Sequence, residues 1–406
     1  MLQGLTLQAG GSNDSIGDLV RREGWCLHQR LQVAARPGAA IQTANRSGSL
    51  DHWRGLVAPN MPGNFDNRLE WDGLTSSSAA WALEPPEPAT PLKPDWLPLL
   101  DGLRQAARDA APEPAPDVVA GAENQPLVGR GAEQPFVHVW RPAAAWALNC
   151  LRQRCGDLSP ELQLADSAWL DLGEALLERF WNTADQALWV LFNQRRSPGQ
   201  MLLAHLGASG DGKGEPVHEA YDIFVAELLE SGYGLLLGEF PVLGRLLAML
   251  SALWLEGSEE MLRRVAASRA TLSQHFAIDS AAPLAGIQLG LSDPHRGGRA
   301  VAILNFEQGD TTSRVVYKPK DMRVDGTYQR YLVDLNQAST LPPLRSLAVA
   351  SRDAYGFMEW VEHSPCTNDA ELALFYFNAG RTMALLYLLG CNCSGVGTAQ
   401  RELCPC

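Results

Sequence analysis

Apolar side chains recur every three or four positions through most of the chain between Gln134 and Phe276, as in Phe224, Leu228 and Leu229. This spacing gathers them on one face of an α-helix. We therefore predict a helical region here. The expected helices cover about residues 137–155, 160–182, 217–237, 241–256 and 258–276.

A different pattern begins after Ala277. Two short runs of apolar and β-branched residues, 301–306 and 314–318, flank a turn at Gly309-Asp310, which indicates two paired strands. Further on, the pattern predicts a helix at about 327–336, strands at 346–351 and 356–362, and an amphipathic helix at 369–389. The order strand, strand, helix, strand, strand, helix predicts an α+β fold that resembles the small lobe and first large-lobe helix of a kinase-like protein.

The N-terminal part has weak periodicity. Residues 1–64 are rich in Gly, Ser, Asn and Arg, and we expect them to be poorly ordered, with some docking through Trp25 and Trp53. Proline-rich breaks follow at 84–94 and 111–116. The resulting division is a poorly ordered segment at 1–64, a mostly helical part at 65–276, a kinase-like part at 277–390 and a cysteine-containing tail at 391–406.

Composition and charge exclude several classes of protein. The 406 residues carry a net charge of −13, so the overall field repels nucleic acid and anionic membranes. The most apolar stretch, 234–255, contains Glu239, Pro241 and Arg245, which argues against a membrane span. With eight cysteines in so long a chain and no visible secretory signal, we expect a protein of the reducing cytoplasm.

The charge balance reverses locally. Between Asp293 and Arg330 the chain holds seven basic and five acidic residues, a balance of +2 inside an acidic protein. Such a pocket suits a phosphate group, although a solvated surface with scattered ion pairs gives the same count. Lys318 stands out because it ends an apolar strand, where a lysine can clamp nucleotide phosphates. The alternative is an ordinary edge-strand lysine.

Two further groups of residues are candidates for chemistry. Asp293 and His295 lie two positions apart on a glycine-bounded loop and could cooperate in proton transfer; alternatively, Asp293 caps a turn and His295 is exposed. Two Cys-x-Cys pairs near the C-terminus could bind zinc, but the spacing is tighter than usual, and incidental thiols are the simpler interpretation. These cysteines are Cys391, Cys393, Cys404 and Cys406.

Several motifs together resemble a known family. They are Gly-Leu-Ser-Asp-Pro-His-Arg-Gly-Gly-Arg at 290–299, Val-Val-Tyr-Lys-Pro-Lys-Asp-Met-Arg-Val-Asp at 315–325, Tyr-Gly-Phe-Met-Glu-Trp-Val at 355–361 and Arg-Thr-Met-Ala-Leu-Leu-Tyr-Leu-Leu-Gly at 381–390. With weaker likeness at 68–74 and 221–276, they resemble the dehydratase domain of type 2 (LanM-type) lanthipeptide synthetases over about residues 65–390.

The resemblance implies a lipid-kinase-like core that uses ATP and Mg²⁺ to phosphorylate Ser and Thr in a precursor peptide and then eliminates phosphate. By motif match, Lys318 would contact the nucleotide phosphates, and Asp293 and His295 would belong to the phosphorylation and elimination centre. The hinge beside the adenine would lie at Glu359 to Val361; the alternative is a plain half-buried strand. No metal ligands are assigned, and no zinc is expected because the family's zinc cyclase domain is absent.

The sequence departs from the family after Gly390, where a catalytic loop with Asp, His and Asn is expected. No Asp occurs after Asp369 and no His after His363. We therefore expect a synthetase truncated before its catalytic loop, with a tail produced by a frameshift or early stop and an exposed apolar face on the last helix. The possible partners are the precursor peptide and a separately encoded remainder. The alternatives are a non-catalytic remnant that binds a peptide or partner, and a stand-alone protein or lipid kinase.

Overall fold

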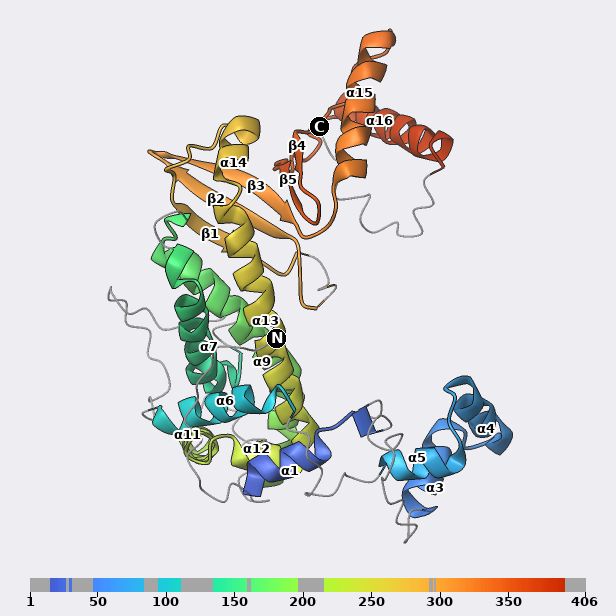
Figure 1. The fold of residues 1–406 in the computed structure, drawn as a ribbon, viewed down its shortest axis with the longest axis vertical. Coiled ribbons are helices and arrows are strands. Elements are labelled where there is room, and N and C mark those ends of the chain that lie inside the picture. Colours follow the sequence, from blue (N-terminus) through green and yellow to red (C-terminus); the bar gives the residue numbers. More distant parts are fainter. Residues whose placement is uncertain are drawn as a thin grey trace. The chain divides into compact units, whose positions relative to one another are not determined.

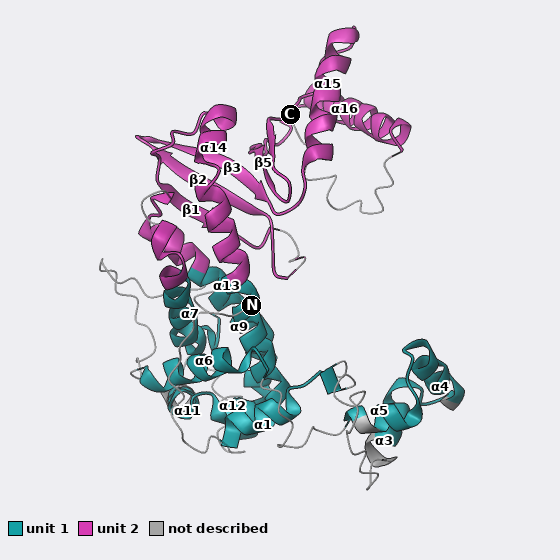
Figure 2. Cartoon of the chain, in the orientation of Figure 1, with its two compact units in different colours: residues 1–151, 173–255 teal, residues 152–172, 256–406 magenta. Residues whose placement is uncertain are grey.

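The computed structural model describes residues 15–26, 29–30, 47–83, 94–110, 134–158, 162–195, 215–291, 295 and 297–390. The chain divides into two compact units. Unit 1 comprises residues 1–151 and 173–255, and unit 2 comprises residues 152–172 and 256–406 (Figure 2). None of the described helices combines the length and the apolar character that crossing a bilayer requires.

Unit 1 is helical throughout its described residues (Figure 1). Its core includes Trp140 and Tyr233, whose ring centroids lie 4.7 Å apart, and the Tyr233 hydroxyl donates to the Val139 carbonyl at 3.0 Å. The helices that begin in this unit are α1 (Ser15–Glu23), α3 (Ser47–Val57), α4 (Pro62–Trp71), α5 (Ser76–Leu83), α6 (Leu97–Asp109), a 3₁₀ turn at Val137–Trp140, α7 (Arg141–Arg154), α11 (Glu215–Glu230), α12 (Gly234–Glu239) and α13 (Pro241–Ala266).

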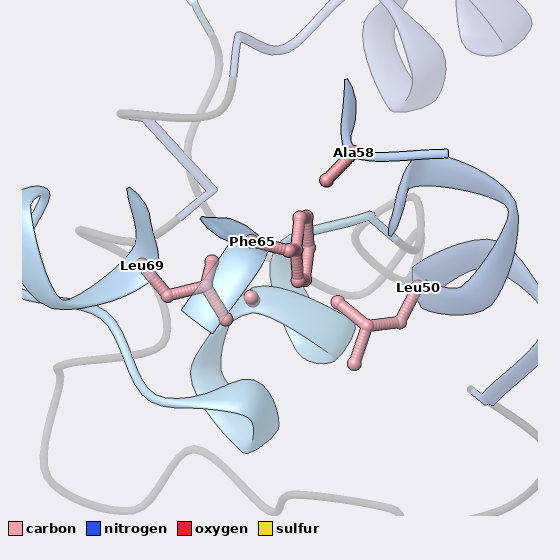
Figure 3. Packing of buried hydrophobic residues seen from close by; sticks show 5 residues of the cluster. Leu50, Ala58, Phe65 and Leu69 are labelled. Atoms are coloured by element: carbon pink, nitrogen blue, oxygen red, sulfur yellow. The ribbon is translucent and has the colours of Figure 1, made fainter. Parts of the chain in front are cut away.

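Helices α3, α4 and α5 share a small core of their own. Figure 3 shows the ring of Phe65 between Leu50 and Leu69, with Ala58 close by. Phe65 is completely buried, and Trp53 meets it edge-on at 5.0 Å between ring centroids. These helices fall partly inside the N-terminal segment expected to be poorly ordered, since residues 47–57 and 62–64 of that segment are helical.

Unit 2 is built around a five-stranded antiparallel sheet in the order β1-β2-β3-β5-β4. The strands are β1 (Leu284–Gln288), β2 (Ala302–Gln308), β3 (Thr311–Lys318), β4 (Val349–Ser351) and β5 (Gly356–Glu359). The helices are α9 (Asp166–Arg195), which begins here, α14 (Arg269–Phe276), α15 (Arg323–Ala338) and α16 (Asp369–Leu388), together with a 3₁₀ turn at Gly156–Leu158. Helix α15 connects β3 to β4.

The two faces of the sheet differ. Along β3, Val315 and Tyr317 alternate with Val316 and Lys318, so the two pairs project from opposite faces. The Tyr317 face is buried around its middle, where Val315 and Phe357 are both 0% exposed. Side chains from α13 and α14 cover this face, which forms the hydrophobic core of unit 2. On the Lys318 face, Ile303, Met358 and Lys318 are also buried, and Val316 is half-buried.

The structure confirms the mixed helix and sheet expected from the sequence, including both strands around Gly309, helix α15, and strands β4 and β5. Strand β1 was not predicted. Helix α13 continues through Gly257 to Ala266, so the expected break at 256–258 is wrong. The expected helix at 217–237 is two helices, α11 and α12, separated at Tyr233, which adopts a left-handed conformation with φ 60°. The proline-rich breaks lie almost entirely outside the described residues.

Candidate functional site

The loop between β1 and β2 lies at the same end of the sheet as the C-terminal end of β3. The register places Gln288, the last residue of β1, opposite Ile303, and Ala302, the first residue of β2, opposite Tyr317. The connecting loop, residues 289–301, therefore leaves the sheet at the same end as Lys318. The topology therefore brings the loop that carries His295 and the strand end that carries Lys318 to one end of the sheet.

Lys318 is a buried lysine, only 7% exposed, at the last position of β3. Its partner across the strand pair is Gly356, the first residue of β5. A Cβ at position 356 would lie 2.9 Å from the Met322 sulfur and 2.8 Å from the Ala350 carbonyl oxygen. Because no side chain fits there, a glycine stands beside the lysine, and Met322 fills the adjoining space.

The loop closes on itself through two hydrogen bonds. The amide of His295 donates to the Arg299 carbonyl at 2.8 Å, and the amide of Arg299 donates back to the His295 carbonyl at 2.9 Å. Between them, Gly297 and Gly298 have φ values of 83° and 87°, a region that glycine enters without strain. The His295 side chain is exposed. Asp293 lies outside the described residues, so its predicted pairing with His295 stays a prediction.

Helix α13 holds this loop through an ion-pair network. Both Arg299 Nε–H and Nη2–H donate to the Glu260 carboxylate, the former at 3.0 Å to each oxygen. Arg264 Nη1 also pairs with Glu260, at 2.5 Å, and donates to the Tyr317 hydroxyl at 2.9 Å. The hydrogen bonds from Arg299, helped by the charge of Arg264, hold the pKa of Glu260 below its ordinary value. Burial raises the pKa of Tyr317.

The predicted hinge residues lie at the other end of β5. Glu359 pairs with Val315, three positions along β3 from Lys318, or about 10 Å at the rise of a strand. Its carboxylate accepts hydrogen bonds from Arg345 Nη2 at 2.8 Å and from the Ala348 amide at 3.1 Å. This side chain therefore fixes the segment before β4. Val361 is half-buried just beyond the strand.

Within the described residues, no group of three or more His, Cys, Asp or Glu side chains is placed to hold a metal ion. The two carboxylates nearest to Lys318 along the chain are occupied, since Asp321 pairs with Arg323 and Asp325 with Lys320 at 3.3 Å. No magnesium ligand is therefore assigned among the described carboxylates. The C-terminal Cys-x-Cys pairs lie outside the described residues.

Glu260 is the functional candidate that sequence reasoning missed. The spacing of Glu260 and Arg264, four apart on a predicted helix, indicates an ordinary surface pair. Nothing in that spacing points to Arg299, which is 39 residues away. Arg299 itself was counted among the local basic residues.

Residues 240–393 match the family model described as Domain of unknown function (DUF4135), a domain found in lanthionine synthetase-like proteins. The match includes all five strands, the loop at 289–301, Lys318 and Glu260. No curated protein matches the chain.

Proposed function

We propose that this chain takes part in lanthipeptide biosynthesis as the ATP-binding part of a kinase-like peptide dehydratase. The reaction is the dehydration of Ser and Thr in a precursor peptide by phosphorylation followed by phosphate elimination. The match to a domain of lanthionine synthetase-like proteins supports the pathway. The observation that carries the nucleotide-binding role is the shared sheet end, where a glycine-containing loop and a buried lysine lie together.

The order of elements supports a kinase-like small lobe. In protein kinases a glycine-rich loop covers the phosphates, a lysine on the third strand pairs with them, and a helix follows that strand. Here the loop at 289–301 joins β1 to β2, Lys318 ends β3, and α15 follows. Backbone amides around Gly297 and Gly298 can approach a phosphate closely because these residues carry no side chain. An ammonium at the same end supplies the opposite charge.

The chemistry explains why one cleft would serve two steps. In the first step, the peptide hydroxyl oxygen bonds to the γ-phosphorus of ATP, ADP leaves, and the hydroxyl proton is lost. In the second, a base removes the α-proton, the electron pair of that C–H bond forms the alkene, and phosphate leaves with the electron pair of the broken C–O bond. Asp293 and His295 are the proposed proton-transfer groups. We place the reaction in the cytoplasm, where ATP is available.

Magnesium is not assigned to any described residue, and no step is derived through it. A second candidate function is a non-catalytic protein that binds a peptide or a partner. Helix α16 favours it, because it has no buried residue and exposes Leu374, Tyr376 and Phe377 by 48%, 66% and 49%.

Mass spectrometry of a precursor peptide separates these functions. Incubation with the chain, ATP and magnesium should remove about 18 Da per modified residue if it dehydrates the peptide, whereas a stable gain of about 80 Da indicates a simple kinase. Unchanged mass with peptide bound supports the non-catalytic function. Nucleotide binding is measured separately by titration with ADP.

The ADP titration compares two variants, each of which replaces one lysine with methionine. Lys318→Met should weaken ADP binding at least about tenfold, because it removes a charge-assisted contact worth roughly 1.5–3 kcal/mol. Lys320→Met is the control, because this lysine is 55% exposed and pairs with Asp325. Equal ADP affinity in both variants would refute the assignment of Lys318.

A further inference from the structure

The carboxylate of Glu260 connects the two parts of the proposed phosphate site. It accepts hydrogen bonds from Arg299, whose backbone pairs with that of His295 and closes the loop hairpin. It also forms an ion pair with Arg264, whose guanidinium donates to the Tyr317 hydroxyl. Tyr317 immediately precedes Lys318, so a single carboxylate links the loop to the end of β3.

The same network reaches the strand beside Lys318. The Arg264 guanidinium lies over the Tyr355 ring at 4.8 Å from its centroid, and the Tyr355 hydroxyl meets the Ser268 hydroxyl at 3.0 Å. Tyr355 immediately precedes Gly356, the residue paired with Lys318. Arg264 therefore contacts both Tyr317, which precedes Lys318, and Tyr355, which precedes the cross-strand partner Gly356, and Arg264 itself pairs with Glu260.

Charge makes Glu260 the central member of this network. It stands between two cations that would repel each other without it. The side chain of Glu260 is 25% exposed, that of Arg264 19% and that of Arg299 32%. Solvent therefore screens these ion pairs only in part. With Arg299 occupied by Glu260 through two nitrogens, the loop has a fixed attachment to α13.

A close backbone contact adds to that attachment. A Cβ at Gly257, one turn before Glu260 on α13, would lie 3.4 Å from the Gly298 carbonyl oxygen. The helix thus presents its smallest residue where the loop glycine approaches. The loop is located by this contact at Gly298 and by the ion pair at Arg299.

From these contacts we infer that Glu260 is a positioning residue for phosphate binding: it holds the loop at 289–301 and the end of β3 in one arrangement. This inference rests on the proposed function. It assigns a role to Glu260, which lies outside the sequence motifs that suggested that function. Glu260 acts through Arg299 and Arg264 and does not itself contact the nucleotide.

The test compares two adjacent glutamates on α13 in the full chain. Glu260→Gln removes the charge that holds the loop. Glu259→Gln is the matched control, because Glu259 pairs with Arg263 at 3.1 Å and Arg154 at 3.5 Å, away from the loop residues. Binding of ADP and of AMP is measured by titration calorimetry, and hydrogen exchange of peptides from 289–301 is followed without nucleotide.

Glu260→Gln should weaken ADP binding about tenfold and AMP binding less than about threefold, since the loop is expected to act on the outer phosphate. Loop amides should exchange at least about tenfold faster, while Glu259→Gln leaves both readouts near wild type. Arg299→Met should reproduce the selective loss, which gives a second variant if Glu260→Gln folds poorly.

Equal loss of ADP and AMP affinity, or unchanged loop exchange in a folded Glu260→Gln, would overturn the inference. If the native chain binds no ADP, the proposed function fails. The loop exchange then decides on its own whether Glu260 positions the loop.

Discussion

Gly356 occupies a position beside Lys318 at which the structure leaves no room for a side chain. A Cβ there would lie 2.8 Å from the Ala350 carbonyl oxygen and 2.9 Å from the Met322 sulfur. The first neighbour is backbone of the paired strand β4, and Met322 is completely buried. Gly356→Ala therefore forces β4, Met322 or both to move.

The size of the effect follows from two opposing contributions. Overpacking of a filled core costs about 1–3 kcal/mol. Alanine restricts the unfolded chain more than glycine does, which offsets about 0.5–1 kcal/mol. We expect Gly356→Ala to lower the free energy of unfolding by about 0.5–2 kcal/mol.

Hydrogen exchange of β3 and β5 peptides in increasing urea measures this stability for unit 2, without assuming that the whole chain unfolds in one step. Gly326→Ala on α15 is the control, because this substitution is expected to raise the free energy of unfolding. Its Cβ would meet only the Val349 Cγ1 atom at 3.7 Å, so helix propensity should raise stability by about 0.5–1 kcal/mol. A Gly356→Ala variant as stable as wild type would refute the packing argument.

Three further outcomes are expected. Gly102→Ala should lower the thermal stability of unit 1 by roughly 1–3 kcal/mol, because the new methyl group would overlap the indole of Trp146; an unchanged melting profile would contradict this. The stability difference between wild type and Glu260→Gln should be largest at neutral pH and should shrink as the pH falls below about 4.5. The pKa of Glu260 is lower in the folded protein than in the unfolded chain, so its ionised carboxylate stabilises the fold above the unfolded pKa and loses this effect when it is protonated. Urea midpoints measured across this pH range test the expectation. Burial raises the pKa of Cys155 to about 11, so iodoacetamide at pH 8 should modify it at least about 100-fold more slowly than the half-buried Cys26, as followed by peptide mass spectrometry.

The sequence allowed four of the five described strands, β2 to β5, to be predicted because alternation and turn residues act locally. The Gly309-Asp310 turn determines the pairing of β2 with β3, and Lys318 followed by Pro319 marks the strand end. Strand β1 escaped prediction because it includes Gly286, next to which the pairing register shifts. Its identity as a strand depends on β2, which lies beyond the intervening loop.

Tertiary contacts explain the other differences. Gly257 suggested a break because glycine costs roughly 1 kcal/mol in a helix, yet α13 continues and the glycine allows the loop backbone at Gly298 to approach. Glu260 gave no functional signal because its partner Arg299 is distant in sequence. Residues 15–23 form α1 despite weak periodicity, with Val20 fully buried. The apolar face expected to be exposed on the last helix is exposed in part: Leu374 on α16 and Leu389 just after it are exposed, and Leu385 and Leu386 are half-buried.

The most direct test of the phosphate site is hydrogen exchange of the native chain with and without saturating ADP. We expect slower exchange in two separate segments, the loop around 297–301 and the β3 end around 316–320, with little change in α3 to α5. Protection confined to other segments, with neither of these affected, would contradict a nucleotide site at this end of the sheet.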